Sequence, residues 1–157
     1  MKDAPARIRY AGDDLFVATT PSGHAQVLDT NNARANAASP MELLLIALGG
    51  CTAVDVVSIL HKSRARVTDY EIEVRGRRRD EHPRSFDEME VHHILRGENL
   101  TERAVERAIR LSEEKYCSVA ATLRPTATIT SRFTILTADA STPAEDRADD
   151  EIEVAAD

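Results

Sequence analysis

Apolar residues dominate one long stretch of the chain, Leu43 to Leu60, in which the only charged residue is Asp55. The stretch predicts a helix that begins at Ser39 and Pro40, because serine caps helix N-termini and proline suits the first turn. We expect this helix to run to about Arg64. Its apolar positions cover all faces of the helix, so it should be buried on every side, either inside a core or between two subunits.

Two glycines, Gly49 and Gly50, stand in this stretch directly before Cys51. Each costs a helix about 1 kcal/mol relative to alanine, which predicts the close approach of another backbone or of a ligand beside Cys51. The length of the helix also fits a membrane span, but its internal acid and its amphipathic flanks favour a soluble protein. The first ten residues lack the apolar region of a secretory signal, and we expect a cytoplasmic protein.

Shorter patterns predict the other elements. Strands are expected at Arg7–Tyr10, Leu15–Thr19, Ala25–Asp29, from Asp69 through Val74, at Phe86–Arg96 and at Thr126–Leu136. Apolar residues at helical spacing mark 100–116, and a short further helix is expected at 118–123. Because strands and helices do not alternate regularly, the fold class should be α+β, with a largely antiparallel sheet packed on the long buried central helix.

Acidic residues are concentrated at the C-terminus. The 157-residue chain has 20 basic and 27 acidic residues and a net charge of −7. Residues 138–157 hold eight of these acids and one base, Arg147, which leaves a body with 19 residues of each sign. A neutral body with an acidic tail argues against binding to nucleic acid. We expect one domain over residues 1–137 and a disordered tail over residues 138–157.

The chain contains two cysteines, Cys51 and Cys117, which are 66 residues apart and form no CxxC motif. A structural disulfide is not expected in a cytosolic protein. The pair is therefore interpreted either as two inert buried thiols or as a reactive pair.

Histidine spacing gives no reason to expect a metal site. His92 and His93 are adjacent, so on a strand they face opposite ways. His61 and His82 have no ligand-like spacing, and no cofactor motif is present.

Two segments carry the pattern of a known family. SPMELLLIALGGCTAVDVVSIL (39–60) and LSEEKYCSVAATL (111–123) each surround one cysteine, and the N-terminal hairpin holds Ser22-Gly23-His24 followed by Asp29. With these motifs the chain resembles the OsmC/Ohr family of osmotically induced protein C and organic hydroperoxide resistance proteins, and within it the YhfA-type branch. The resemblance covers about residues 7–136.

The resemblance implies an intertwined homodimer with the long helices at its centre and an active site shared between the chains. It also implies a thiol peroxidase that reduces organic hydroperoxides, with Cys51 as the peroxidatic thiol and Cys117 as the resolving thiol. The first thiol is oxidised to a sulfenic acid, the second traps it as an intramolecular disulfide, and an external dithiol restores both.

The chain departs from the best-studied peroxidases of the family at the residues that activate the thiol. Those enzymes pair an arginine of the N-terminal hairpin with a glutamate immediately after the helix-starting proline, whereas here Met41 follows Pro40 and the hairpin has no arginine. Glu42 comes one residue later, a rotation of about 100°.

His24 and Glu42 are therefore the candidate supporting residues. His24 is either a cation beside the thiolate or a hydrogen-bonded residue of the turn. The alternative function is a non-peroxidase thiol protein that senses redox state or binds a small apolar ligand.

Overall fold

The computed structural model describes residues 4–31 and 33–136, and the acidic segment 138–157 lies outside the described residues. The elements in chain order are β1 (Arg7–Gly12), β2 (Leu15–Thr19), β3 (Ala25–Asp29), α1 (Pro40–Lys62), β4 (Arg66–Arg78), β5 (Phe86–Glu98), α2 (Glu102–Leu111), the π-helix η1 (Ser112–Tyr116), α3 (Ser118–Leu123) and β6 (Thr128–Leu136). They build two three-stranded sheets, β1–β2–β3 and β4–β5–β6. The predicted α+β class is confirmed.

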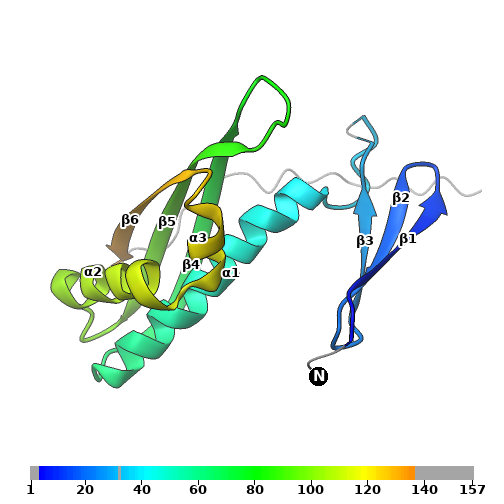
Figure 1. The fold of residues 1–157 in the computed structure, drawn as a ribbon. Helices are drawn as coiled ribbons and strands as arrows, with labels where there is room; N and C mark the ends of the chain where they lie inside the picture. The colour runs from blue at the N-terminus through cyan, green and yellow to red at the C-terminus, as the bar shows by residue number, and fades with distance from the viewer. Residues whose placement is uncertain (1–3, 32, 137–157) are drawn as a thin grey trace, which may run out of the picture.

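The first sheet is an antiparallel meander that stands apart from α1 and the second sheet (Figure 1). Asp13 and Asp14 form its first turn, both with positive φ, as the tightest hairpin turns require. Apolar side chains of this sheet are open to solvent: Ile8, Tyr10 and Val27 are 60%, 66% and 48% exposed. A three-stranded sheet with an open apolar surface has little core of its own.

Asp29 organises the segment that joins the first sheet to α1. Its buried carboxylate accepts hydrogen bonds from the Arg34 guanidinium and from the backbone N–H groups of Asn31 and Asn36, at 2.8–3.1 Å. These donors, Arg34 above all, lower the pKa of Asp29 to about 2. The segment is thus folded around one ionised carboxylate, as expected when several donors meet a single acceptor.

Helix α1 begins where the sequence predicts. The Ser39 hydroxyl accepts the backbone N–H of Glu42, and the Glu42 carboxylate accepts the backbone N–H of Ser39 at 2.6 Å, a reciprocal capping box with Pro40 in the first turn. Such a cap contributes about 0.5–2 kcal/mol to helix stability. The helix ends at Lys62, two residues before the expected end at Arg64.

Helices α1, α2 and α3 lie on one face of the second sheet (Figure 1). Strands β4 and β5 pair antiparallel, as predicted, while β6 pairs parallel to β5 and is reached through a crossover made of α2, η1 and α3. Apolar and polar residues alternate along Phe86–Arg96, which predicts that Met89, Val91, His93 and Leu95 share one face of the strand. All four are buried, so this alternation is confirmed.

Only part of the surface of α1 is covered within one chain. Leu48, Thr52, Val56 and Leu60 are buried at intervals of four residues. The three apolar residues among them pack into two clusters with β5, α2 and α3. The other face is open, with Ile46 64% and Val54 71% exposed. Burial on every side, expected from the sequence, is therefore not reached in the single chain.

The two glycines of α1 differ in what surrounds them. A Cβ on Gly49 would lie 3.0 Å from the nearest methyl of Val74 and 3.4 Å from Ile72, so this glycine allows α1 to approach β4 closely. A Cβ on Gly50 would meet nothing within 4 Å. Gly50 lies between Ile46 and Val54 on the open face, and no contact within the described chain explains it.

Among the described residues, α1 is the one helix long and apolar enough to cross a membrane by length and composition. One face of α1 packs in the core, and its single internal acid, Asp55, accepts a hydrogen bond from Ser112.

Candidate active site

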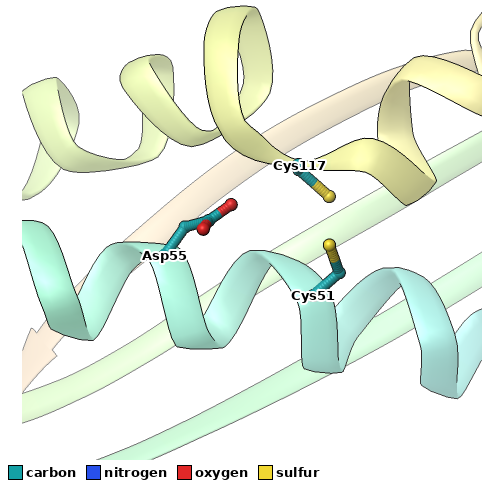
Figure 2. A group of neighbouring side chains, drawn as sticks. All are labelled: Cys51, Asp55 and Cys117. Carbon is teal, nitrogen blue, oxygen red and sulfur yellow. The ribbon is translucent and has the colours of Figure 1, made fainter. Parts of the chain in front are cut away.

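The structure brings the two cysteines together. Cys51 lies in the middle of α1, and Cys117 lies between η1 and α3, in the crossover that leads to β6. Their Sγ atoms lie within 4.8 Å of each other, and both thiols are free. Figure 2 shows the two side chains pointing toward each other across the gap between α1 and the crossover. A disulfide bond of about 2.05 Å requires the two sulfurs to approach each other further.

Cys117 is buried and its sulfur is held by two contacts. The Sγ atom accepts the backbone N–H of Ala120 at 3.3 Å, which makes Cys117 the N-cap of α3. The Thr52 hydroxyl lies 3.5 Å from the same sulfur and donates its proton to the Leu48 carbonyl at 2.9 Å. Because that proton is committed to Leu48, the hydroxyl oxygen is placed to accept the S–H of Cys117.

Cys51 is partly exposed and its surroundings favour the protonated thiol. Burial raises the pKa of Cys51, and the neighbouring Cys117 and Asp55 raise it further, while the N–H of Val119 acts in the opposite direction. A peroxidatic thiol reacts as the thiolate. Within the described part of the chain, Cys51 lies next to its partner thiol, and none of the groups that shift its pKa carries a positive charge.

Asp55 is the third member of the group, and the sequence analysis did not select it. One turn after Cys51 on α1, it brings a carboxylate oxygen within 4.8 Å of both sulfurs (Figure 2). The Ser112 hydroxyl donates a hydrogen bond of 2.9 Å to this carboxylate. The available signal was the spacing of Cys51 and Asp55, since residues four apart share one face of a helix.

The π-helix η1 sets the position of Cys117. The Cys117 backbone N–H donates to the Ser112 carbonyl, five residues earlier, at 2.8 Å. Ser112 is itself fully buried and bonded to Asp55. Single π-turns are frequent at functional sites because the wider turn redirects the residues that follow. Here the wide turn ends at the thiol.

Neither predicted supporting residue lies in this group within one chain. His24 is exposed in the β2–β3 turn, where its Nδ1 lies 3.0 Å from the Ser22 hydroxyl, on the sheet that stands apart from α1 (Figure 1). Glu42 precedes Cys51 by nine residues, about 13 Å along the helix axis, and its carboxylate caps the helix. Met41, at the position of the family glutamate, packs against the core near Leu48.

A cavity of about 470 Å³ borders the group on the Asp55 side. Its lining combines two cations with apolar and hydroxyl groups from α1, α2 and η1: Asp55, Ser58, Ile59, Lys62, Arg107 and Tyr116. Asp55 belongs to both the cavity and the thiol group, whereas neither cysteine lines the cavity.

Comparison with known proteins gives one family. Residues 32–132 match the family model described as OsmC-like protein. The protein YhfA of Escherichia coli K12 is 44% identical over 133 residues, which is 85% of this chain and 98% of YhfA. This alignment includes most of the described residues.

Solved structures share the fold. A hypothetical protein from Aquifex aeolicus is 32% identical, with a TM-score of 0.73 over 87% of this chain and 100% of the Aquifex chain. The organic hydroperoxide resistance protein OhrB of Bacillus subtilis is 15% identical, with a TM-score of 0.60 over 83% of this chain and 98% of OhrB. With the family model covering most of the chain and a relative at 44% identity, this protein belongs to the OsmC/Ohr family.

Proposed function

We propose that this protein is a thiol peroxidase that reduces organic hydroperoxides through Cys51 and Cys117. The observation that carries the proposal is the approach of two free sulfurs to within 4.8 Å on packed elements of the core. A two-thiol peroxidase needs this arrangement, since a sulfenic acid must be trapped before it is oxidised further. The family includes members named for organic hydroperoxide resistance.

The reaction has three balanced steps. The Cys51 thiolate attacks the distal oxygen of ROOH, the O–O bond breaks, and the alkoxide takes up a proton to leave as the alcohol. The Cys117 thiol then attacks the Cys51 sulfenic acid, which forms the disulfide and releases water. An external dithiol reduces the disulfide to two thiols and is itself oxidised to a disulfide.

The proposed assembly is a homodimer formed on the open face of α1. Ile46, Gly50 and Val54 repeat every four residues on this face, and an apolar stripe with a glycine suits the close packing of a second helix. The exposed apolar side chains of the first sheet belong to the same proposed interface. In this assembly His24 of a second copy is the candidate cation for Cys51, and Glu42 supports the site by fixing the start of α1.

The proposed compartment is the cytoplasm, where reducing conditions keep both thiols free between reaction cycles. The partners are then an organic hydroperoxide and an external dithiol reductant. The role is defence against oxidative stress.

One observation favours the alternative, a redox sensor that uses the same thiols without turnover. Burial and Asp55 raise the pKa of Cys51, which lowers the fraction of reactive thiolate at neutral pH. A sensor needs a single oxidation event, whereas an enzyme needs repeated cycles. The two functions differ in the number of hydroperoxide molecules consumed per chain.

Stopped-flow reduction of cumene hydroperoxide, with a dithiol reductant in excess, separates the two functions. An enzyme consumes many equivalents of hydroperoxide per chain and loses this turnover in Cys51→Ser. His61→Gln, an exposed change on the same helix and outside the cavity lining, is the control and should keep the wild-type rate. Consumption that stops at one equivalent per chain supports the sensor and contradicts the enzyme.

A further inference from the structure

The group formed by Cys51, Asp55 and Cys117 is also a set of metal ligands. We propose that the reduced protein binds a thiophilic divalent cation of the Zn²⁺ class through the two sulfurs and the Asp55 carboxylate. This site goes beyond peroxide reduction and does not depend on it. Two thiolates select Zn²⁺ or Co²⁺ over Mg²⁺ and Ca²⁺, which prefer sites made of oxygen atoms alone.

The distances fit one ion. Each of the three residues offers one ligand atom, and these atoms all lie within 4.8 Å of one another. Around a tetrahedral zinc ion with bonds of about 2.0–2.3 Å, ligand atoms lie roughly 3.3–3.8 Å apart. In Figure 2 the two sulfurs face each other and the Asp55 carboxylate lies beside them, between α1 and the crossover. Binding one ion would draw the three ligand atoms closer together than the 4.8 Å limit.

A donor outside the group contacts each ligand. The N–H of Ala120 bonds to the Cys117 sulfur at 3.3 Å, the N–H of Val119 bonds to the Cys51 sulfur, and the Ser112 hydroxyl bonds to Asp55 at 2.9 Å. Such outer contacts orient metal ligands and stabilise their negative charge. They come from η1 and α3, whereas two of the ligands come from α1, so the ion would tie the crossover to the central helix.

Charge explains why a cation suits this group. Two thiolates and a carboxylate in so small a volume repel one another, and a divalent ion offsets most of that charge. Binding releases the two thiol protons to solvent, so the affinity increases with pH. The protein supplies three ligands, which leaves a fourth position for water or for a small molecule in the adjoining cavity.

Titration of the reduced full-length chain with Co²⁺ under anaerobic conditions tests the site. The expected result is one ion per chain, with a thiolate-to-cobalt charge-transfer band and the strong visible bands of a four-coordinate ion. Zn²⁺ should displace the cobalt and abolish the visible bands. In weak buffer, an indicator should report the release of about two protons per ion.

Variants identify the ligands. Cys51→Ser and Cys117→Ser should each weaken the charge-transfer band and the affinity, and Asp55→Asn should lower the affinity at least tenfold while both thiolate bonds remain. Ser112→Ala should lower it by about tenfold through the outer contact alone. His92→Gln is the matched control for adventitious binding, because His92 lies on the opposite face of β5 from the core, and it should change nothing.

A measurement on the native sequence covers the case in which a variant does not fold. Bound Zn²⁺ should slow alkylation of both cysteines by iodoacetamide, and a chain with both thiols alkylated should bind no Co²⁺. Cobalt binding without a charge-transfer band, or an affinity unchanged by Asp55→Asn, would overturn the three-ligand site. Neither result bears on peroxide turnover, so failure of the metal site is distinguishable from failure of the proposed peroxidase.

Discussion

The Ser112 hydroxyl donates a 2.9 Å hydrogen bond to the Asp55 carboxylate and so links the π-helix to the middle of α1. Both partners lie next to the thiol pair: Asp55 one turn after Cys51, and Ser112 at the start of the wide turn that ends at Cys117. The distance between the two sulfurs therefore depends on a polar contact as well as on apolar packing.

Ser112→Ala should destabilise the protein and slow the formation of the disulfide. The variant leaves the Asp55 carboxylate without its donor, which costs about 1–3 kcal/mol when a polar group is buried. Urea unfolding measures the first effect, and the rate of disulfide formation after one equivalent of hydroperoxide measures the second. The exposed His61→Gln on α1 should show neither effect. Equal stability of Ser112→Ala and wild type would contradict the role of this bond.

Cys117→Ser should turn a reversible oxidation into an irreversible one. Without the second thiol, the Cys51 sulfenic acid persists and reacts with more hydroperoxide to form the sulfinic acid. Mass spectrometry after thiol alkylation distinguishes the products. Wild type treated with one equivalent should give an intramolecular disulfide. If wild type keeps both thiols free under this treatment, the two-thiol mechanism is wrong.

Asp55→Asn should increase the reactivity of Cys51. Burial is the main cause of the raised pKa of the Cys51 thiol, and the negative charge of Asp55 adds to it. Removal of that charge lowers the pKa and increases the thiolate fraction near neutral pH. Alkylation rates from pH 6 to pH 10, compared in a Cys117→Ser background, measure the shift. A pH profile unchanged by the substitution would show that Asp55 does not act on Cys51 through its charge.

His93 should make stability depend on pH. Its ring is fully buried and lies 2.6 Å from the Tyr70 hydroxyl through Nδ1, and burial, with a smaller effect of His92, lowers its pKa from 6.5 to about 4. The unfolded chain binds this proton below about pH 6.5 and the folded chain only below about pH 4. Stability is therefore complete above pH 6.5 and decreases as the pH falls toward 4, by on the order of 3 kcal/mol.

Urea unfolding of wild type at pH 7 and pH 5 measures this change. His93→Gln should be less stable at pH 7 but should flatten the dependence in this range. His61→Gln, an exposed change near the end of α1, is the control and should keep the wild-type slope. The Asp29 carboxylate, with its pKa lowered to about 2, acts in a different window, since its contribution is lost only as the pH falls below about 3.8.

Val54→Glu should prevent the proposed dimer. The side chain is 71% exposed on the open face of α1, and a carboxylate there would be desolvated by a second copy. Sedimentation at low micromolar concentration should give a dimer for wild type and a smaller species for the variant, with a loss of thermal stability. Thr130→Glu on the exposed side of β6 is the control. A stable, folded wild-type monomer would rule out a site shared between chains.

The sequence predicts those parts of this fold that depend on neighbours along the chain. The start of α1 follows from Ser39, Pro40 and Glu42, which are three adjacent or nearly adjacent residues. The buried face of β5 follows from strict alternation, because one side of the strand meets the helices. The position of Cys117 near Cys51 was inferred from the chemistry of a two-thiol site and from the family motifs.

Other features depend on contacts that no local pattern records. Ser112 and Asp55 are 57 residues apart, and the π-turn adds one residue to a helix whose apolar spacing continues through it. The parallel pairing of β6 with β5 depends on the length and packing of the crossover. The position of His24 depends on how the first sheet is placed relative to α1. The residues of that sheet carry no sequence signal for this placement.

The crossover from β5 to β6 contains Cys117, and this affects how the chain is made. During synthesis Cys51 leaves the ribosome 66 residues before Cys117, when α1 has neither the crossover helices nor β6 to pack against. No partner thiol is available to the growing chain until Cys117 has been made. The sulfur pair forms only when the crossover has packed on α1, and its first appearance therefore marks the docking of that segment.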